Sequence, residues 1–142
     1  MKNFFVVRNQ ASDVSLVLLL IRVVTGYAFI LHGWGKIQSP MSWMGPESPV
    51  PGILQALGAL SEFGGGILLI LGLLTRLGAL GLMLTMLVAV IMHAFIMGDP
   101  FVNLTGGGSF EPATVYFLIS LLILVIGPGR FSLDHKFFGS KS

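Results

Sequence analysis

The stretch LGALSEFGGGILLILGLLTR (residues 57–76) places a single carboxylate, Glu62, in the middle of an otherwise apolar segment. In water such a residue is a solvated surface charge. Inside a bilayer it is costly unless a partner compensates it, and it usually faces the interior of a helix bundle. The solvent around this segment therefore decides what Glu62 does and how the chain folds.

The composition answers the question of solvent. The chain has 142 residues, of which 54% are hydrophobic and only 10% are charged, whereas a soluble domain has about 25% charged residues. Because so few charges do not cover a soluble surface, the sequence predicts an integral membrane protein, with the lipid bilayer as its main partner and no nucleic-acid partner. The absence of cysteine excludes disulfides, cysteine-ligated metal centres and thiol redox relays within the chain.

Four apolar segments are each long enough to cross a membrane, which takes about 20 residues. They are predicted to be helices because backbone groups in lipid must be satisfied internally. Ser109 is expected to cap the fourth helix, with Pro112 in its first turn. The expectation is an all-α, antiparallel four-helix transmembrane bundle forming one domain over residues 1–142, with helices at about 14–35, 52–74, 77–97 and 109–127, outward loops at 36–51 and 98–108, and a tail at 128–142.

The basic residues predict the orientation of the bundle. If the N-terminus is cytoplasmic, only Lys36 lies outside, and the basic residues that lie inside are Lys2, Arg8, Arg76, Arg130, Lys136 and Lys141. This distribution follows the positive-inside rule. Both termini are therefore predicted to be cytoplasmic.

Counting depth along the helices pairs the two charges near the membrane centre. At about 1.5 Å per residue, Arg22 lies roughly 12 Å from the inner side and Glu62 roughly 15 Å from the outer side. Since the two helices run in opposite directions, the charges reach similar depths, and an Arg22–Glu62 ion pair is predicted. Two roles remain open for it: a structural pair that fixes helix register, and a site that hydrogen-bonds a ligand or relays a proton.

The same count places His32 and His93 together in the outer third of the membrane. With the ion pair as its floor, a polar pocket opening outward is predicted, lined by Arg22, His32, Lys36, Glu62, His93 and Glu111. Three interpretations of the histidines remain open: interfacial hydrogen bonding, acid–base work beside a quinone head group, and axial ligation of haem. Two membrane histidines alone are weak support for haem, and no metal site is predicted because zinc needs further ligands.

Several motifs, in this order, resemble the DoxX family: HGWGK (32–36), SEFGGG (61–66), GLLTRLGA (72–79), MHAF (92–95) and GPGRFSLD (127–134). The resemblance covers about residues 14–134. It implies a small four-helix protein of a bacterial or archaeal plasma (inner) membrane. Founding relatives are linked to thiosulfate:quinone oxidoreductase, others to oxidative-stress systems, and distant ones to chaperoning or cargo recognition. Because the family is functionally mixed, the fold transfers and the activity does not.

Three hypotheses of function follow. The first is a membrane subunit or accessory of a quinone-linked redox or oxidative-stress system, with the polar pocket binding a quinone or a small sulfur oxyanion. Whether it is an enzyme is left open, since the chain has no intrinsic redox centre and electron transfer needs a bound quinone, a cofactor or an oxidoreductase partner. The alternatives are a non-catalytic membrane scaffold or assembly factor, and a small transporter that acts as a homo-oligomer.

Overall fold

The computed structural model describes Val7 and residues 10–139. Over these residues the chain is helical, and the only strand-like pairing is an isolated bridge between Val7 and Gly139. The helices are α2 (Ser12–Gln38), α3 (Gly52–Leu71), α4 (Thr75–Ile91), the π-helix η1 (Met92–Met97), α5 (Glu111–Ile126) and α6 (Leu133–Phe138). The all-α prediction is confirmed. Three residues of the charge count, Lys2, Arg8 and Lys141, lie outside the described residues.

Three helical segments are long and apolar enough to cross a membrane: α2 with 27 residues, α3 with 20, and Thr75–Met97 with 23. α5 is apolar but has only 16 residues. The exposed side chains of these helices are predominantly large and hydrophobic, as expected where the surrounding solvent is lipid. The chain is therefore a multi-pass integral membrane protein.

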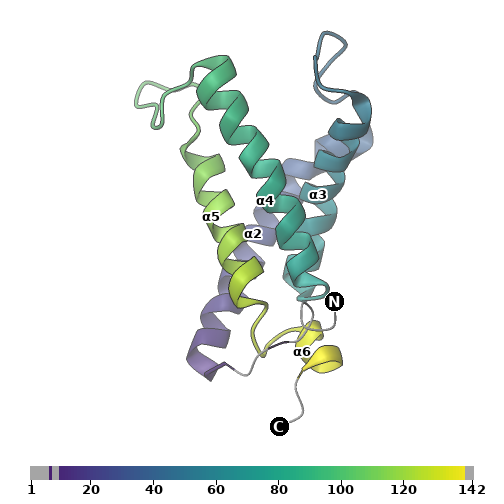
Figure 1. The fold of residues 1–142 in the computed structure, drawn as a ribbon, viewed down its shortest axis with the longest axis vertical. Helices are drawn as coiled ribbons and strands as arrows, with labels where there is room; N and C mark the ends of the chain where they lie inside the picture. The colour runs from purple at the N-terminus through teal and green to yellow at the C-terminus, as the bar shows by residue number, and fades with distance from the viewer. Residues whose placement is uncertain (1–6, 8–9, 140–142) are drawn as a thin grey trace.

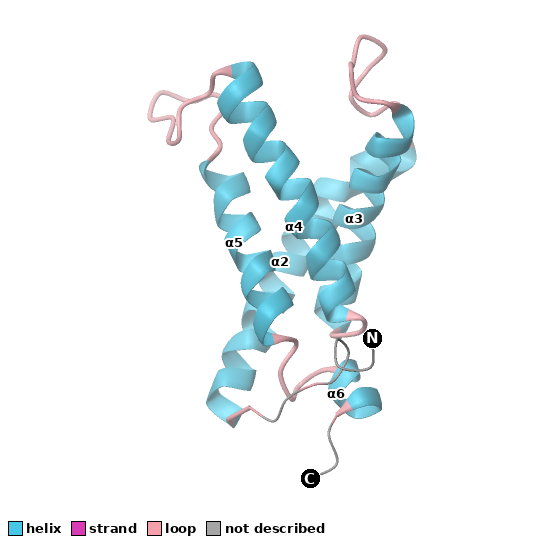
Figure 2. Ribbon diagram, in the orientation of Figure 1, coloured by secondary structure: helices cyan, strands magenta, loops and turns pink. Residues whose placement is uncertain are grey.

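The helices pack in chain order (Figure 1). α2 lies against α3, α3 against α4, and α4 against α5, while α2 and α5 are in contact over only a short length. The buried core, which is Phe29, Leu69, Ala79, Leu82, Met86 and Ile123, draws on all four helices. Beyond this core the pair α2–α3 diverges from the pair α4–α5 toward the end that carries the two long loops (Figures 1 and 2). We call this the loop end, and the opposite end, which carries α6, the tail end.

Glycines allow α2 and α3 to approach closely. A Cβ atom on Gly26 would lie 2.6 Å from the carbonyl oxygen of Gly66, and one on Gly33 would lie 2.5 Å from the backbone nitrogen of Phe63. Small residues of this kind let helix backbones meet in membranes. The two helices are consequently near enough for side chains of moderate length to bridge them.

Several helix ends differ from the predicted ones by one to three residues. α2 runs over Ser12–Gln38 rather than about 14–35, which places Lys36 in the helix and not in the predicted loop. Local reasons explain the differences at two other helix ends. α3 ends at Leu71 rather than Leu74 because Gly72 adopts a left-handed conformation (φ 64°), and the backbone N–H of Leu73 donates to the Leu68 carbonyl, a common helix stop. The prediction that Ser109 caps the fourth helix is wrong. Phe110 holds the cap position without a side-chain hydrogen bond, although Pro112 does lie in the first turn.

Candidate functional site

The predicted Arg22–Glu62 ion pair is wrong, because Glu62 pairs with Lys36. The Lys36 Nζ atom lies 2.6 Å from Glu62 Oε1 and 2.7 Å from Oε2. The side chain of Glu62 is 3% exposed and that of Lys36 is 26% exposed. An opposite charge thus compensates the buried carboxylate, as a membrane interior demands, while the Lys36 side chain as a whole remains partly exposed.

An aromatic ring and a glutamine complete this cluster. Lys36 Nζ lies 4.5 Å from the centroid of the Trp43 ring, which is within the range of a cation–π interaction. Trp43 Nε1 donates to the Gln55 carbonyl at 2.9 Å. The Gln55 side chain in turn accepts from the Met44 N–H and donates to the Val50 carbonyl. These contacts hold the connection between α2 and α3 beside the ion pair. We call Lys36, Glu62, Trp43 and Gln55 the loop-end cluster.

Helix register places His32 beside this cluster. Phe29, His32 and Lys36 recur at intervals of three and four residues, so they lie along one side of α2. The ring of Phe29 packs against Tyr116 of α5, with centroids 5.0 Å apart, which turns this side of α2 toward α5. Since the helix pairs diverge above that contact (Figure 1), His32 is exposed and Lys36 is partly exposed.

His93 belongs to a separate pair. It lies in η1, where its Nδ1 is 2.6 Å from Asp99 Oδ2, and its carbonyl accepts from the Asp99 N–H. A π-helix is an uncommon element that recurs at functional sites. Among the described residues no hydrogen bond joins His93 to His32, and no group of three or more potential metal ligands occurs. Glu111 begins α5, with its backbone N–H bonded to the Phe101 carbonyl.

Arg22 lies at the tail end instead of on the floor of the pocket. It is 1% exposed, and its guanidinium donates to the carbonyls of Leu69 (2.9 Å), Ile70 (3.4 Å), Pro128 (2.5 Å) and Phe131 (3.0 Å). The last carbonyls of a helix lack intrahelical partners, and a cation there is favoured by the helix dipole. Arg22 therefore caps α3 and holds the chain that follows α5.

The depth count failed because it gave both helices the same membrane boundaries. α2 has 27 residues and α3 has 20, so α2 extends past the end of α3. Leu69 is seven residues beyond Glu62, which separates the partner of Arg22 from Glu62 by about 10 Å along α3.

Asp134 has a structural role that the sequence did not predict. Its Oδ1 accepts from the Leu74 N–H at 2.7 Å and its Oδ2 from the Thr75 N–H at 2.8 Å. Its own N–H donates to the Gly72 carbonyl. A carboxylate on unpaired N–H groups at a helix start is stabilising, so α6 caps α4 from a distant part of the chain. The signal was present in the sequence, since GLLTR (72–76) and GPGRFSLD (127–134) are the two segments that meet here.

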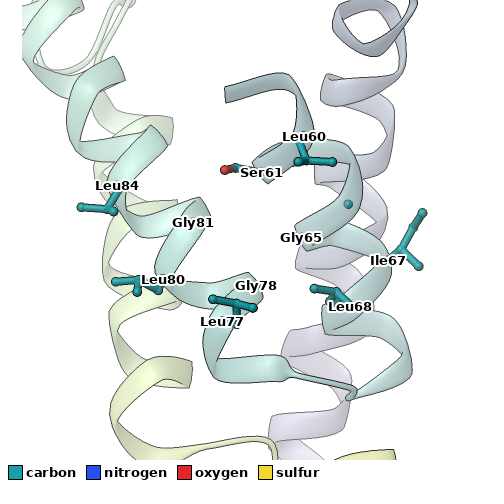
Figure 3. A pocket seen from close by; sticks show the side chains of 11 residues that line it. Leu60, Ser61, Gly65, Ile67, Leu68, Leu77, Gly78, Leu80, Gly81 and Leu84 are labelled. Atoms are coloured by element: carbon teal, nitrogen blue, oxygen red, sulfur yellow. The ribbon is translucent and has the colours of Figure 1, made fainter. Parts of the chain in front are cut away.

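An apolar groove of about 570 Å³ lies between α3 and α4 (Figure 3). None of the six residues of the predicted polar pocket lines it. Its floor is made of small residues and its walls of leucines; the lining residues are Leu60, Ser61, Gly64, Gly65, Ile67, Leu68, Leu77, Gly78, Leu80, Gly81 and Leu84.

Comparison with known proteins identifies the family of this chain. The model of the DoxX family matches residues 17–94, which include both residues of the Lys36–Glu62 pair. The chain belongs to the DoxX family. This DoxX chain is 37% identical over 123 residues to an uncharacterized protein of Haemophilus influenzae, covering 85% of this chain and 90% of the relative. It is also 36% identical over 129 residues to the inner membrane protein YqjF of Escherichia coli, covering 82% of this chain and 88% of the relative. No solved structure matches it significantly.

The family match divides the polar residues of this DoxX chain into two groups. Arg22, His32, Lys36, Glu62 and His93 lie within the matched segment. Glu111 and Asp134 lie beyond it. The DoxX match thus spans the whole loop-end cluster. At the tail end it includes Arg22 but not the residues after α5 that contact Arg22 and α4.

Proposed function

We propose that this DoxX protein resides in the inner membrane with four spans, α2 to α5, and with both termini in the cytoplasm. The relative from Escherichia coli is named as an inner membrane protein. The bridge between Val7 and Gly139 brings the two described ends of the chain to the same end of the bundle. Arg76, Arg130 and Lys136 belong to that end and Lys36 to the other, which supports a cytoplasmic tail end by the positive-inside rule.

We further propose that it is a membrane subunit or accessory of a quinone-linked redox or oxidative-stress system, and that the loop-end cluster binds the ligand. The observation that carries this proposal is the number of N–H donors of Lys36 that have an acceptor within the chain. An ammonium group has three N–H donors, and the hydrogen bonds of Lys36 within the described chain go to the two oxygens of Glu62. The third donor of this partly exposed side chain faces no hydrogen-bond acceptor of the described chain, and it can serve an acceptor such as a quinone carbonyl or a sulfur oxyanion beside the Trp43 ring.

The neighbouring side chains suit the same class of ligand. Glu62 and Trp43 hold Lys36 in place, so little side-chain entropy remains to be lost when a ligand binds. His32, one helical turn away and exposed, supplies a second polar group that can hydrogen-bond a ligand. A bound quinone would supply the redox chemistry, since cysteine is absent from the chain. The role of the protein is then to bind the head group and orient it toward a partner.

The test is binding of a short-chain quinone, and separately of thiosulfate, to the purified protein in mild detergent. Lys36→Met removes the donor, and Lys136→Met on α6 is the matched control because it removes one exposed lysine at the opposite end. We expect affinity to fall at least tenfold for Lys36→Met and to be unchanged for Lys136→Met. Equal binding by Lys36→Met would refute the proposed site.

A different result would favour the scaffold hypothesis. If neither ligand binds the unmodified protein and Lys36→Met changes only its thermal stability, the loop-end cluster is architectural. The search would then turn to proteins that co-purify with the chain. Ligand-dependent flux in vesicles, with a stable oligomer in detergent, would instead support the transporter hypothesis.

A further inference from the structure

The loop between η1 and α5 exposes large apolar side chains. Leu104 is 91% exposed, Phe101 50% and Val102 43%, and in the preceding η1 Phe95 is 81% exposed. Exposed hydrophobic residues scattered singly are ordinary, but here they gather on one short segment. A contiguous group of this kind marks a surface that contacts something apolar.

The lengths of the adjoining helices place this loop relative to the membrane. At the tail end α4 and α5 are level, since Arg76 Nη2 lies 3.5 Å from the Val125 carbonyl oxygen. From there Thr75–Met97 rises through 23 residues, roughly 34 Å, whereas α5 has 16 residues, roughly 24 Å. The loop-end terminus of α5 consequently lies about 10 Å closer to the membrane centre than that of η1.

Hydrogen bonds close the base of the loop beside the first turn of α5. The Phe110 N–H donates to the Pro100 carbonyl and the Glu111 N–H to the Phe101 carbonyl. The rings of Phe101 and Phe110 pack with centroids 5.2 Å apart. Residues 102–109 therefore start and finish beside the first turn of α5. Figure 1 shows this segment projecting sideways from the bundle, whereas the connection between α2 and α3 continues along its long axis.

Charge and hydrogen bonding indicate the kind of surface that the loop meets. Asp99 is the only charged residue among residues 98–110, and His93 pairs with it. Asn103 ties the tip internally, accepting from the Thr105 N–H and donating to the Gly108 carbonyl. Other amides of the tip still need water, which excludes the hydrocarbon core. A lipid-facing loop with these properties fits the boundary between head groups and acyl chains.

We propose that residues 101–104 insert into this boundary in the leaflet at the loop end, so that the partner of this surface is phospholipid. Phe101, Val102 and Leu104 contact acyl chains there. Because α5 is short, the loop that precedes it spans the remaining distance to the membrane surface. Since the segment carries no cationic group, insertion depends on apolar contact. It is therefore equally strong in zwitterionic and anionic bilayers and is insensitive to salt.

The absence of cysteine permits a direct test. Leu104→Cys is labelled with the environment-sensitive dye NBD, and the protein is reconstituted at low density into phosphatidylcholine vesicles. Glu47→Cys is the matched control, because Glu47 is exposed in the other loop at the same end. Some of the lipids carry a nitroxide quencher near the head group or, in a second preparation, near the end of the acyl chain.

We expect blue-shifted emission from the Leu104 position, with quenching by the shallow nitroxide at least twofold stronger than by the deep one. The Glu47 position should show water-like, weakly quenched emission. Water-like emission from both positions would overturn the proposal. Blue-shifted emission at Leu104 that lipid nitroxides do not quench, and that increases with protein density, would also overturn the proposal. In that case a second copy of the protein would cover the loop. The readout involves no quinone, so its outcome is independent of the ligand-binding proposal.

Discussion

A double-mutant cycle on the unfolding free energy distinguishes the observed Lys36–Glu62 pair from the Arg22–Glu62 pair that depth counting predicts. Lys36→Met leaves the carboxylate of Glu62, which is 3% exposed, without its cation. Removing one partner of a fully buried pair costs about 3–5 kcal/mol. Because the Lys36 side chain is 26% exposed, we expect about 2–3 kcal/mol here, which allows for partial solvent screening.

The coupling energy is the decisive quantity. Side chains in direct contact couple by about 0.5–3 kcal/mol, and sites more than about 7–10 Å apart add within about 0.5 kcal/mol. Lys36→Met and Glu62→Gln should therefore couple by about 1–3 kcal/mol. Arg22→Met and Glu62→Gln should be additive, since the nearest α3 carbonyl that Arg22 binds is that of Leu69, about 10 Å from Glu62 along the helix.

The assay is unfolding by SDS in mixed micelles, followed by far-UV circular dichroism, with Lys136→Met as the control that should be additive with Glu62→Gln. Helicity is the better signal because Trp43 lies against Lys36 and its fluorescence would change with the substitution itself. A coupling above about 1 kcal/mol between Arg22 and Glu62, together with additivity between Lys36 and Glu62, would refute the geometry described above.

Three further predictions concern the packing of the helices and the tail end. Gly66→Val should destabilise the protein by about 1–3 kcal/mol, because its side chain would meet the backbone of Gly26. Gly58→Ala, which meets nothing within 4 Å, should be neutral or stabilising, and equal melting temperatures for the two variants would contradict this packing. Asp134→Asn should cost about 1–2 kcal/mol in SDS unfolding, because an amide NH2 would replace one of the two oxygens that accept the N–H groups of Leu74 and Thr75. A loss below about 0.3 kcal/mol would show that the second of these hydrogen bonds is dispensable. Arg22→Lys should recover only part of the stability lost in Arg22→Met, because one ammonium group cannot replace a planar guanidinium that donates to four carbonyls. Full recovery of the melting temperature would show that the guanidinium geometry is not needed.

Glu62 shows how much the local sequence determines about a buried charge. That Glu62 is buried and needs a cation follows from its apolar surroundings alone. Which cation it meets depends on helix lengths, crossing points and the path of the connection between α2 and α3. Of these, the apolar segments of the sequence predict only the helix lengths. Arg22 was nearer in counted depth, but α2 runs past the end of α3, and the free carbonyls there accept the guanidinium instead.

The sequence by itself determined the membrane environment, the helical class and the approximate number and extent of the apolar segments. These follow from composition and from the demand that backbone groups in lipid satisfy one another. Its motifs also determined the DoxX resemblance, which the family match confirms. Only the tertiary structure decided the partners of the polar residues: Lys36 for Glu62, Asp99 for His93, and the α4 backbone for Asp134. The physical reason is that hydrogen bonds and ion pairs act over about 3 Å, whereas an error of two residues in a helix boundary displaces a side chain by about 3 Å.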